Sequence, residues 1–152
     1  MLPYLEQGNL YQQFHLDEDW DSEHNMALVE KMPDIFKCPG VEKPGNTSYH
    51  VFLGEETPFG ADEPRGIRNI LDGTSNTIMI VQAGSDTADV WTKPSGLEYD
   101  PEEPRKCLGN IGERFLIMLC DGASRFISSD VENETLLRMI ECADGQPVSI
   151  DP

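Results

Sequence analysis

The densest group of chemically capable side chains lies in the segment LDEDWDSEHN, residues 16–25. Carboxylate oxygens are the ligands that Ca²⁺ prefers, so this acidic loop is the first candidate for a metal site. Its spacing does not follow the EF-hand pattern, and close carboxylates on an extended loop point in alternating directions. We therefore expect a solvated loop that caps the following helix, with a weak calcium site as the less favoured alternative. The candidate ligands are Asp17, Glu18, Asp19 and Asp21.

Other residue types that could do chemistry are scattered along the chain. His15, His24 and His50 share no metal-ligand spacing,. The serine in GTSNT does not lie in a Gly-x-Ser-x-Gly elbow, and GVEKPG lacks the ending of a phosphate-binding loop,. The sequence thus predicts no catalytic residues and no bound cofactor, and we expect the protein not to be an enzyme.

The cysteines give no redox or zinc motif, because none of them forms a CxxC pair,. Cys120 lies in an apolar run and Cys142 on a helical pattern, so both are expected to be small buried hydrophobes. Cys38 and Cys107 each lie near a proline in or beside a loop. If the protein is exported, the sequence is compatible with a disulfide between these two cysteines but does not decide whether it forms.

The segment FLIMLCDGASRFISSD, residues 115–130, places Asp121-Gly122 between two strand-like runs. Asp-Gly in this position is a strong signal for a type I′ hairpin turn. We therefore predict that Asp121 and Gly122 form a two-residue structural turn, with Ile117 opposite Phe126, and that Asp121 is not a catalytic carboxylate.

The elements that must position these residues indicate a single α+β domain over residues 1–152, in which an N-terminal helix packs across an antiparallel sheet. Leu2, Leu5, Leu10 and Phe14 lie roughly on one stripe, which predicts a helix over residues 2–16,. Further helices are expected over residues 22–31 and 132–145, the latter stopped by Gly145. About four strands are expected. They are Thr47–Leu53, Thr77–Ala83, Arg114–Cys120 and Ser124–Ser129.

Residues 85–110 are rich in proline and glycine, and we interpret them as a long surface loop pinned by Trp91,. The balance of 28 acidic against 11 basic side chains gives the chain a net charge of −17. A field of that sign repels phosphate backbones and anionic lipids, which excludes nucleic acid as an expected partner. The sequence also lacks a long apolar run and a signal-peptide pattern. Membrane contact is therefore expected only through an N-terminal helix that would precede residue 1.

Several segments occur in the same order as in a known bacterial family. They are LPYLEQGNLYQQF, WDSEHNMALVEKMPDIFKCP, TSY, ILDGTSNTIMIVQAG, VWTKPSGLEYDP and DGASRFIS. Together they resemble the prepilin-like exported proteins of unknown function that are expanded in planctomycetes. In that family a pilin-type signal and a long apolar helix precede this region. The resemblance therefore implies a pseudopilin-like globular domain without its membrane helix, in which residues 1–16 are the remnant of the stem. Family members often carry a histidine before the terminal Asp-Gly, and LGNIGERFLIMLCDG has none.

The resemblance implies a non-enzymatic structural or interaction module of the cell envelope, periplasmic or extracellular. Such a module would work through protein partners or self-assembly along the stem helix, and Tyr4, Leu5 and Tyr11 are the expected interaction patch. The alternative is an extracellular module that binds a carbohydrate or Ca²⁺ through the acidic loop, Trp20 and Trp91. A deep pocket lined by these residues would favour the alternative.

Overall fold

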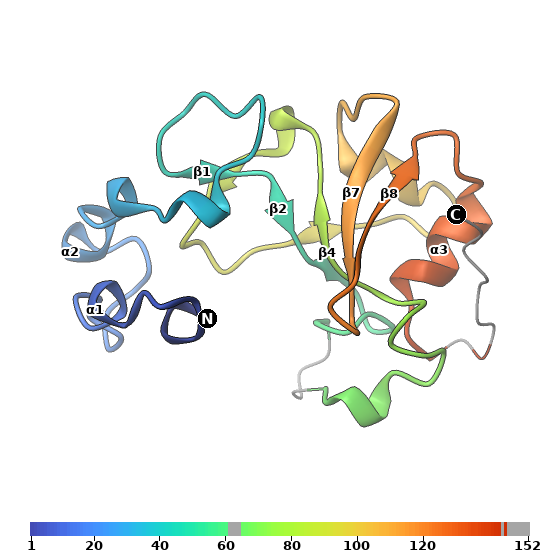
Figure 1. The fold of residues 1–152 in the computed structure, drawn as a ribbon, viewed down its shortest axis with the longest axis horizontal. Coiled ribbons are helices and arrows are strands. Elements are labelled where there is room, and N and C mark those ends of the chain that lie inside the picture. The colour runs from blue at the N-terminus through green and yellow to red at the C-terminus, as the bar shows by residue number, and fades with distance from the viewer. Residues whose placement is uncertain (61–64, 144, 146–152) are drawn as a thin grey trace.

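The computed structural model describes residues 1–60, 65–143 and 145, so the predicted domain extends beyond the described part at its C-terminal end. The chain folds as a mixed α+β protein around a four-stranded sheet in the order β2-β4-β7-β8 (Figure 1). All neighbouring strands of this sheet are antiparallel, which confirms the predicted sheet type. The strands are Tyr49–His50 (β2), Ile78–Gln82 (β4), Arg114–Leu119 (β7) and Ser124–Ser128 (β8).

The core lies on one face of this sheet because apolar residues alternate along its strands. In β7, Phe115, Ile117 and Leu119 are buried, whereas the residues between them point to the outer face,. The register of β4 shifts between Ile78 and Ile80. This irregularity allows Ile78 and Val81, three positions apart, both to reach the core,.

Helix α3, Asn133–Ile140, supplies the layer that covers the core. Its residues Leu136, Met139 and Ile140 share one helical face and are fully buried in the same cluster as the strand residues,. The helix ends at Ile140, before Gly145, where the sequence predicts the stop. Figure 1 shows α3 beside β7 and β8, while α1 and α2 lie at the opposite end of the molecule.

The long helix predicted over residues 2–16 is not formed. A 3-10 helix, Leu2–Leu5 (η1), and a short α-helix, Gly8–Tyr11 (α1), replace it. Between them Glu6 adopts a left-handed conformation with φ of 60°, which turns the chain,. The predicted packing of this helix across the sheet is therefore wrong: these short helices lie with α2 away from the sheet (Figure 1).

The hairpin is present, but its register differs from the prediction by one residue. Leu116 faces Phe126, and Ile117 faces Arg125. Leu119 accepts a hydrogen bond from the Gly122 amide (2.9 Å) and donates one to the Ala123 carbonyl (2.8 Å). The loop thus has three residues and ends at Gly122 with φ of 87°, as in a type I turn followed by a bulge,. The extra loop residue brings Ile127 opposite Phe115 on the core face, which explains why this register is preferred,.

The strand predicted over Thr47–Leu53 is divided into three short pieces. Asn46–Thr47 (β1) pairs antiparallel with Asp89–Val90 (β5), β2 joins the main sheet, and Phe52–Leu53 (β3) pairs parallel with Leu97–Glu98 (β6). The predicted surface loop at residues 85–110 therefore supplies two strands, and its Leu108 is fully buried.

The remaining helices of the described residues are short. Ser22 caps α2, Glu23–Met26, and its hydroxyl accepts a hydrogen bond from the Asn25 amide, so the helix expected from residue 22 begins as predicted. The rest of that helix is 3-10 and ends before Pro33. No described helix has the length and apolar character needed to cross a bilayer. The 3-10 helices are Val29–Lys31 (η2), Asp34–Phe36 (η3), Ile67–Asn69 (η4), Ser85–Thr87 (η5) and Pro104–Leu108 (η6).

Candidate functional site

Trp91 joins the N-terminal segment, residues 1–38, to the rest of the chain. Its indole N–H donates to the Val29 carbonyl at 2.9 Å, and its backbone amide donates to the Gly45 carbonyl at 3.0 Å. Its ring stacks on Phe36 at a centroid distance of 5.3 Å and meets Phe14 edge-on at 6.0 Å. Aromatic pairs at these distances are attractive beyond the area they bury. Trp91 therefore holds the N-terminal segment in place, as well as pinning the loop in which it lies.

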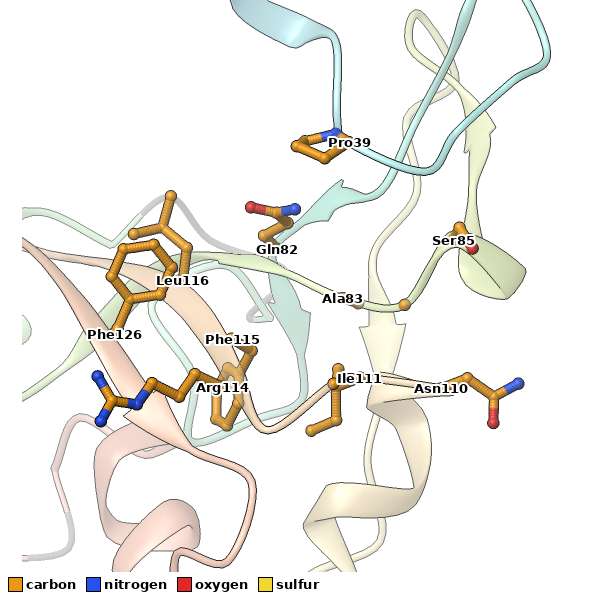
Figure 2. A pocket seen from close by; sticks show the side chains of 12 residues that line it. Pro39, Gln82, Ala83, Ser85, Asn110, Ile111, Arg114, Phe115, Leu116 and Phe126 are labelled. Atoms are coloured by element: carbon orange, nitrogen blue, oxygen red, sulfur yellow. The ribbon is translucent and has the colours of Figure 1, made fainter.

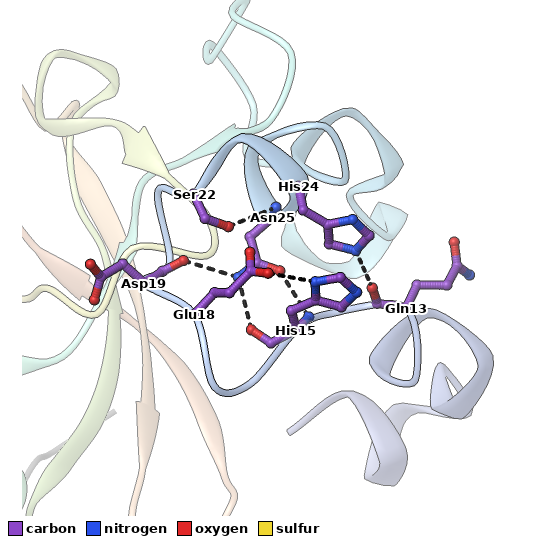
Figure 3. Close-up of polar contacts among 7 residues, drawn as sticks. All are labelled: Gln13, His15, Glu18, Asp19, Ser22, His24 and Asn25. Carbon is purple, nitrogen blue, oxygen red and sulfur yellow. Dashed lines mark hydrogen bonds and ion pairs between the residues drawn. The ribbon is translucent and has the colours of Figure 1, made fainter.

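Asn25 closes the acidic loop from within. Its side chain is buried, with 3% exposed, and bonds only to backbone groups of the loop (Figure 3). The side-chain oxygen of Asn25 accepts a hydrogen bond from the backbone amide of His15. Its side-chain nitrogen donates to the backbone carbonyls of His15 and Asp19, and all three bonds are 3.0 Å long. Because these three bonds satisfy a buried side chain, they fix the loop geometry more firmly than surface contacts would.

His15 and His24 stack on each other over this loop, at a centroid distance of 3.5 Å and an interplanar angle of 4°. His15 Nδ1 lies 2.7 Å from a Glu18 carboxylate oxygen, and His24 Nε2 lies 2.7 Å from the Gln13 carbonyl (Figure 3). Since both acceptors lack a proton, each ring nitrogen is the donor. Hydrogen bonds from Ser22 and then from His15 lower the pKa of Glu18 below its usual range. Sequence spacing gave no sign of this pair, because only closure of the loop brings the rings together.

The same residues border an apolar hollow of about 360 Å³ at the surface of the N-terminal segment. We call it the aromatic hollow. Leu16, Glu18 and Trp20 line it from the acidic loop, and Trp91 lines it from the segment after β5. Both tryptophans and Glu18 are candidate ligand-binding residues in the sequence, and the structure brings the three together at this hollow. Its other lining residues are Met1, Leu2, Tyr11, Phe14, His15, Asn25, Phe36 and Thr92.

The predicted calcium ligands do not converge. Among residues 1–60, 65–143 and 145, no group of three or more carboxylate, histidine or cysteine side chains is arranged to hold a metal ion. Asp17, Asp19 and Asp21 are exposed, while Glu18 turns toward His15. Figure 3 shows the Asp19 carboxylate directed away from Glu18 in a loop that is built from turns rather than extended backbone.

The residues of the predicted interaction patch differ in exposure. The Tyr4 side chain is 92% exposed and Tyr11 is 38% exposed, whereas Leu5 is half-buried. Met1 and Leu16, both at the hollow, are 73% and 67% exposed. Leu2 and Leu10 instead are buried. The N-terminal segment therefore carries large apolar side chains into solvent around the aromatic hollow.

One comparison with known proteins gives a match, and it falls on this part of the chain. Residues 1–57 match the model of a family described as "Protein of unknown function (DUF1559)". The matched residues include η1, α1, the acidic loop, α2 and β1–β3. No curated protein and no solved structure matches the chain.

A second hollow, of about 200 Å³, lies on the outer side of the main sheet (Figure 2). Leu116 and Phe126, neighbours across β7 and β8, line it together with Arg114, and Phe126 is 67% exposed. Asp121 lies outside it, at the hairpin loop, where its carboxylate accepts a hydrogen bond from the Ala123 amide at 2.9 Å. That bond stabilises the turn, in agreement with a structural role for Asp121.

The remaining titratable groups are spread through the fold. All four cysteines are free thiols, so the bridge between Cys38 and Cys107 is not formed in this structure. Burial raises the pKa of Cys107 and of Cys120 to about 11. Burial lowers the pKa of His50, against smaller opposing effects from Thr87 and Asp89.

Proposed function

We propose that the protein is a non-enzymatic interaction module, exported to the cell envelope, that works through protein–protein contacts of its N-terminal segment. The resemblance to prepilin-like proteins expanded in planctomycetes supports a pilin-like or pseudopilin-like role. The observation that carries the proposal is the set of exposed apolar side chains at the aromatic hollow, Met1, Tyr11 and Leu16, together with the exposed Tyr4 on η1. Exposed apolar side chains gathered at one hollow are typical of sites where soluble domains meet a partner.

The chemistry of the most perturbed groups supports a role without catalysis. Burial raises the pKa of Cys107 and Cys120 to about 11, which keeps both sulfurs as thiols at neutral pH. A nucleophilic cysteine requires the opposite shift, toward the thiolate. Burial also raises the pKa of Tyr99 to about 12, and its hydroxyl donates to Glu141 rather than facing a site.

Photo-crosslinking in the native cell tests the proposal. A photoreactive amino acid replaces Tyr4 or Tyr11 in the patch, and Ile67 or Leu71 as controls, which are similarly apolar and 74% and 73% exposed. We expect adducts of defined mass, containing either a protein partner or a second copy of the chain, from the patch positions and not from the controls. Equal yields at all positions, or no adduct at Tyr4 and Tyr11, would contradict the proposal.

A second candidate function is an extracellular ligand-binding module. Trp20 and Trp91 line one hollow together with Glu18 and His15, and aromatic surface beside a few polar groups is typical of small-ligand sites,. A neutral oligosaccharide that quenches tryptophan fluorescence saturably would support this candidate. For Ca²⁺, calorimetry would have to detect one-to-one binding that is abolished by Asp19→Asn combined with Asp21→Asn.

A further inference from the structure

We infer that the aromatic hollow binds a cationic polypeptide segment in which lysine or arginine residues flank an aliphatic or aromatic side chain. The inference rests on the proposed function and names the chemistry of its partner. Two features of the hollow lead to it: an apolar floor and an acidic border.

The floor is apolar and is held in place by the fold. Trp91 is stacked against Phe36 and fixed by the hydrogen bond to the Val29 carbonyl. Binding therefore does not carry the entropy cost of ordering the Trp91 side chain. Leu16 and Met1 reach the hollow while remaining largely exposed. A volume of about 360 Å³ falls within the range of small-ligand sites and leaves room for one or two large side chains,.

The border is acidic because the Glu18 carboxylate lines the hollow and three further carboxylates lie beside the lining residues in sequence. Leu16, Glu18 and Trp20 line the hollow, and the exposed Asp17, Asp19 and Asp21 lie next to them in sequence. Throughout residues 1–38 carboxylates far outnumber lysines. The carboxylates are Glu6, Asp17, Glu18, Asp19, Asp21, Glu23, Glu30 and Asp34, against Lys31 and Lys37.

Both lysines of this segment already have partners. The Lys31 ammonium donates to the Gln13 side chain at 2.7 Å, and Lys37 pairs with Asp34 at 2.6 Å. Since eight carboxylates stand against two lysines in residues 1–38, the segment carries a net negative charge, which attracts cations and repels anionic ligands,. A segment that combines positive charge with an apolar side chain complements both features, and its charged residues would speed association.

Charge also favours a cationic segment over the two other candidate occupants of the hollow, a second copy of the chain and a neutral sugar. A second copy of the chain carries the same net charge of −17, so its approach to an acidic border is unfavourable,. A neutral sugar would use the aromatic floor but gain nothing from the surrounding carboxylates.

Intrinsic fluorescence tests the inference on the intact chain, because both of its tryptophans line the hollow. The main probe is a tryptophan-free peptide of lysine, leucine and phenylalanine. One control peptide has glutamate in place of lysine, and another has serine in place of leucine and phenylalanine. We expect saturable binding of the main probe, at least about tenfold tighter than either control and weakened by salt.

Two variants of equal charge change show where the peptide binds. Asp17→Asn with Asp19→Asn and Asp21→Asn neutralises the border, and we expect about tenfold weaker binding. Glu98→Gln with Glu102→Gln and Asp130→Asn neutralises exposed carboxylates elsewhere, and we expect less than about twofold change,. Circular dichroism checks that each variant is folded.

Equal weakening in both variants would overturn the inference, since only the net charge would then matter. Equal binding of the acidic peptide, absence of binding, or displacement of the probe by a second copy of the chain would also overturn it. Crosslinks at Tyr4 to a partner without a cationic segment would refute the inference and leave the proposed function intact. Absence of both crosslinks and peptide binding would refute the two together.

Discussion

Replacing Trp91 by alanine should release the N-terminal segment while leaving the sheet folded. Trp91 contributes one indole hydrogen bond to the Val29 carbonyl and ring contacts with Phe36 and Phe14. The buried cluster of the sheet and α3 contains neither Trp91 nor any residue before Phe52. The two parts of the molecule are therefore stabilised by separate sets of contacts, and the tryptophan belongs to the N-terminal set.

The magnitude follows from these contacts. The hydrogen bond is worth about 1 kcal/mol, and each aromatic pair adds about 0.5–1.5 kcal/mol. Truncating a fully buried tryptophan costs about 3–5 kcal/mol, which sets the upper limit for this mostly buried one. We expect Trp91→Ala to destabilise the N-terminal segment by about 3 kcal/mol. Trp91→Phe keeps an aromatic ring and should lose about 1 kcal/mol with the hydrogen bond.

Amide hydrogen exchange at single-residue resolution measures the two parts independently. A loss of about 3 kcal/mol corresponds to about a hundredfold faster exchange. We expect this at the Gln12 amide, which donates to the Gly8 carbonyl of α1, and much smaller changes at the Ile117 and Val81 amides of the sheet. Tyr4→Ala, at a side chain 92% exposed, is the control and should change none of them,. Equal acceleration in the N-terminal segment and the sheet would show that the two parts are not stabilised independently, contrary to this prediction.

Other perturbations test single features of the fold. Asn25→Ala should cost about 2–3 kcal/mol in denaturant unfolding, because it removes the three hydrogen bonds of a buried side chain and leaves the His15 amide without its Asn25 acceptor,. Gly122→Val should cost about 1–3 kcal/mol, since Gly122 has φ of 87° and only backbone strain opposes the new side chain; an unchanged midpoint would contradict the turn,. Burial holds the pKa of His50 below its ordinary value, so the unfolded chain binds more protons and stability should fall as the pH drops below about 6.5,. His50→Phe should remove that part of the dependence of the unfolding free energy on pH, measured in a pH series of unfolding curves. Because burial raises the pKa of Cys107 and Cys120 to about 11, a thiol reagent at pH 8 should modify them slowly in the folded protein and all four cysteines rapidly in denaturant; equal rates would be inconsistent with the burial,.

The sequence predicts the antiparallel sheet because the apolar runs of β4 and β7 are strong local signals and Asp-Gly links β7 to β8,. The hairpin register escaped prediction because Asp-Gly fits both two-residue and three-residue loops, and burial of Ile127 decides between them,. The helix over residues 2–16 was predicted from an apolar stripe. That stripe also fits two short helices when Glu6 turns the chain, and no local pattern distinguishes these cases.

The candidate site was predictable only in part. Trp20, Trp91 and the acidic loop were recognisable by residue type, since aromatic and acidic side chains in polar segments often contact ligands. Their convergence on one hollow depends on contacts between distant segments, such as the bond from Trp91 to Val29. The stacking of His15 on His24 likewise requires loop closure by the buried Asn25, which nothing in the local sequence indicates.

The most direct test of the central claim is the position at which the cationic peptide contacts the protein, measured by nitrogen–proton correlation NMR of the intact chain. The chain has two indole N–H signals, from Trp20 and Trp91, and both residues line the aromatic hollow. We predict that both indole signals and the Leu16 amide shift saturably on peptide addition, while the amides of Leu116 and Phe126 at the second hollow do not. Shifts confined to Leu116 and Phe126, with unchanged indole signals, would contradict the account.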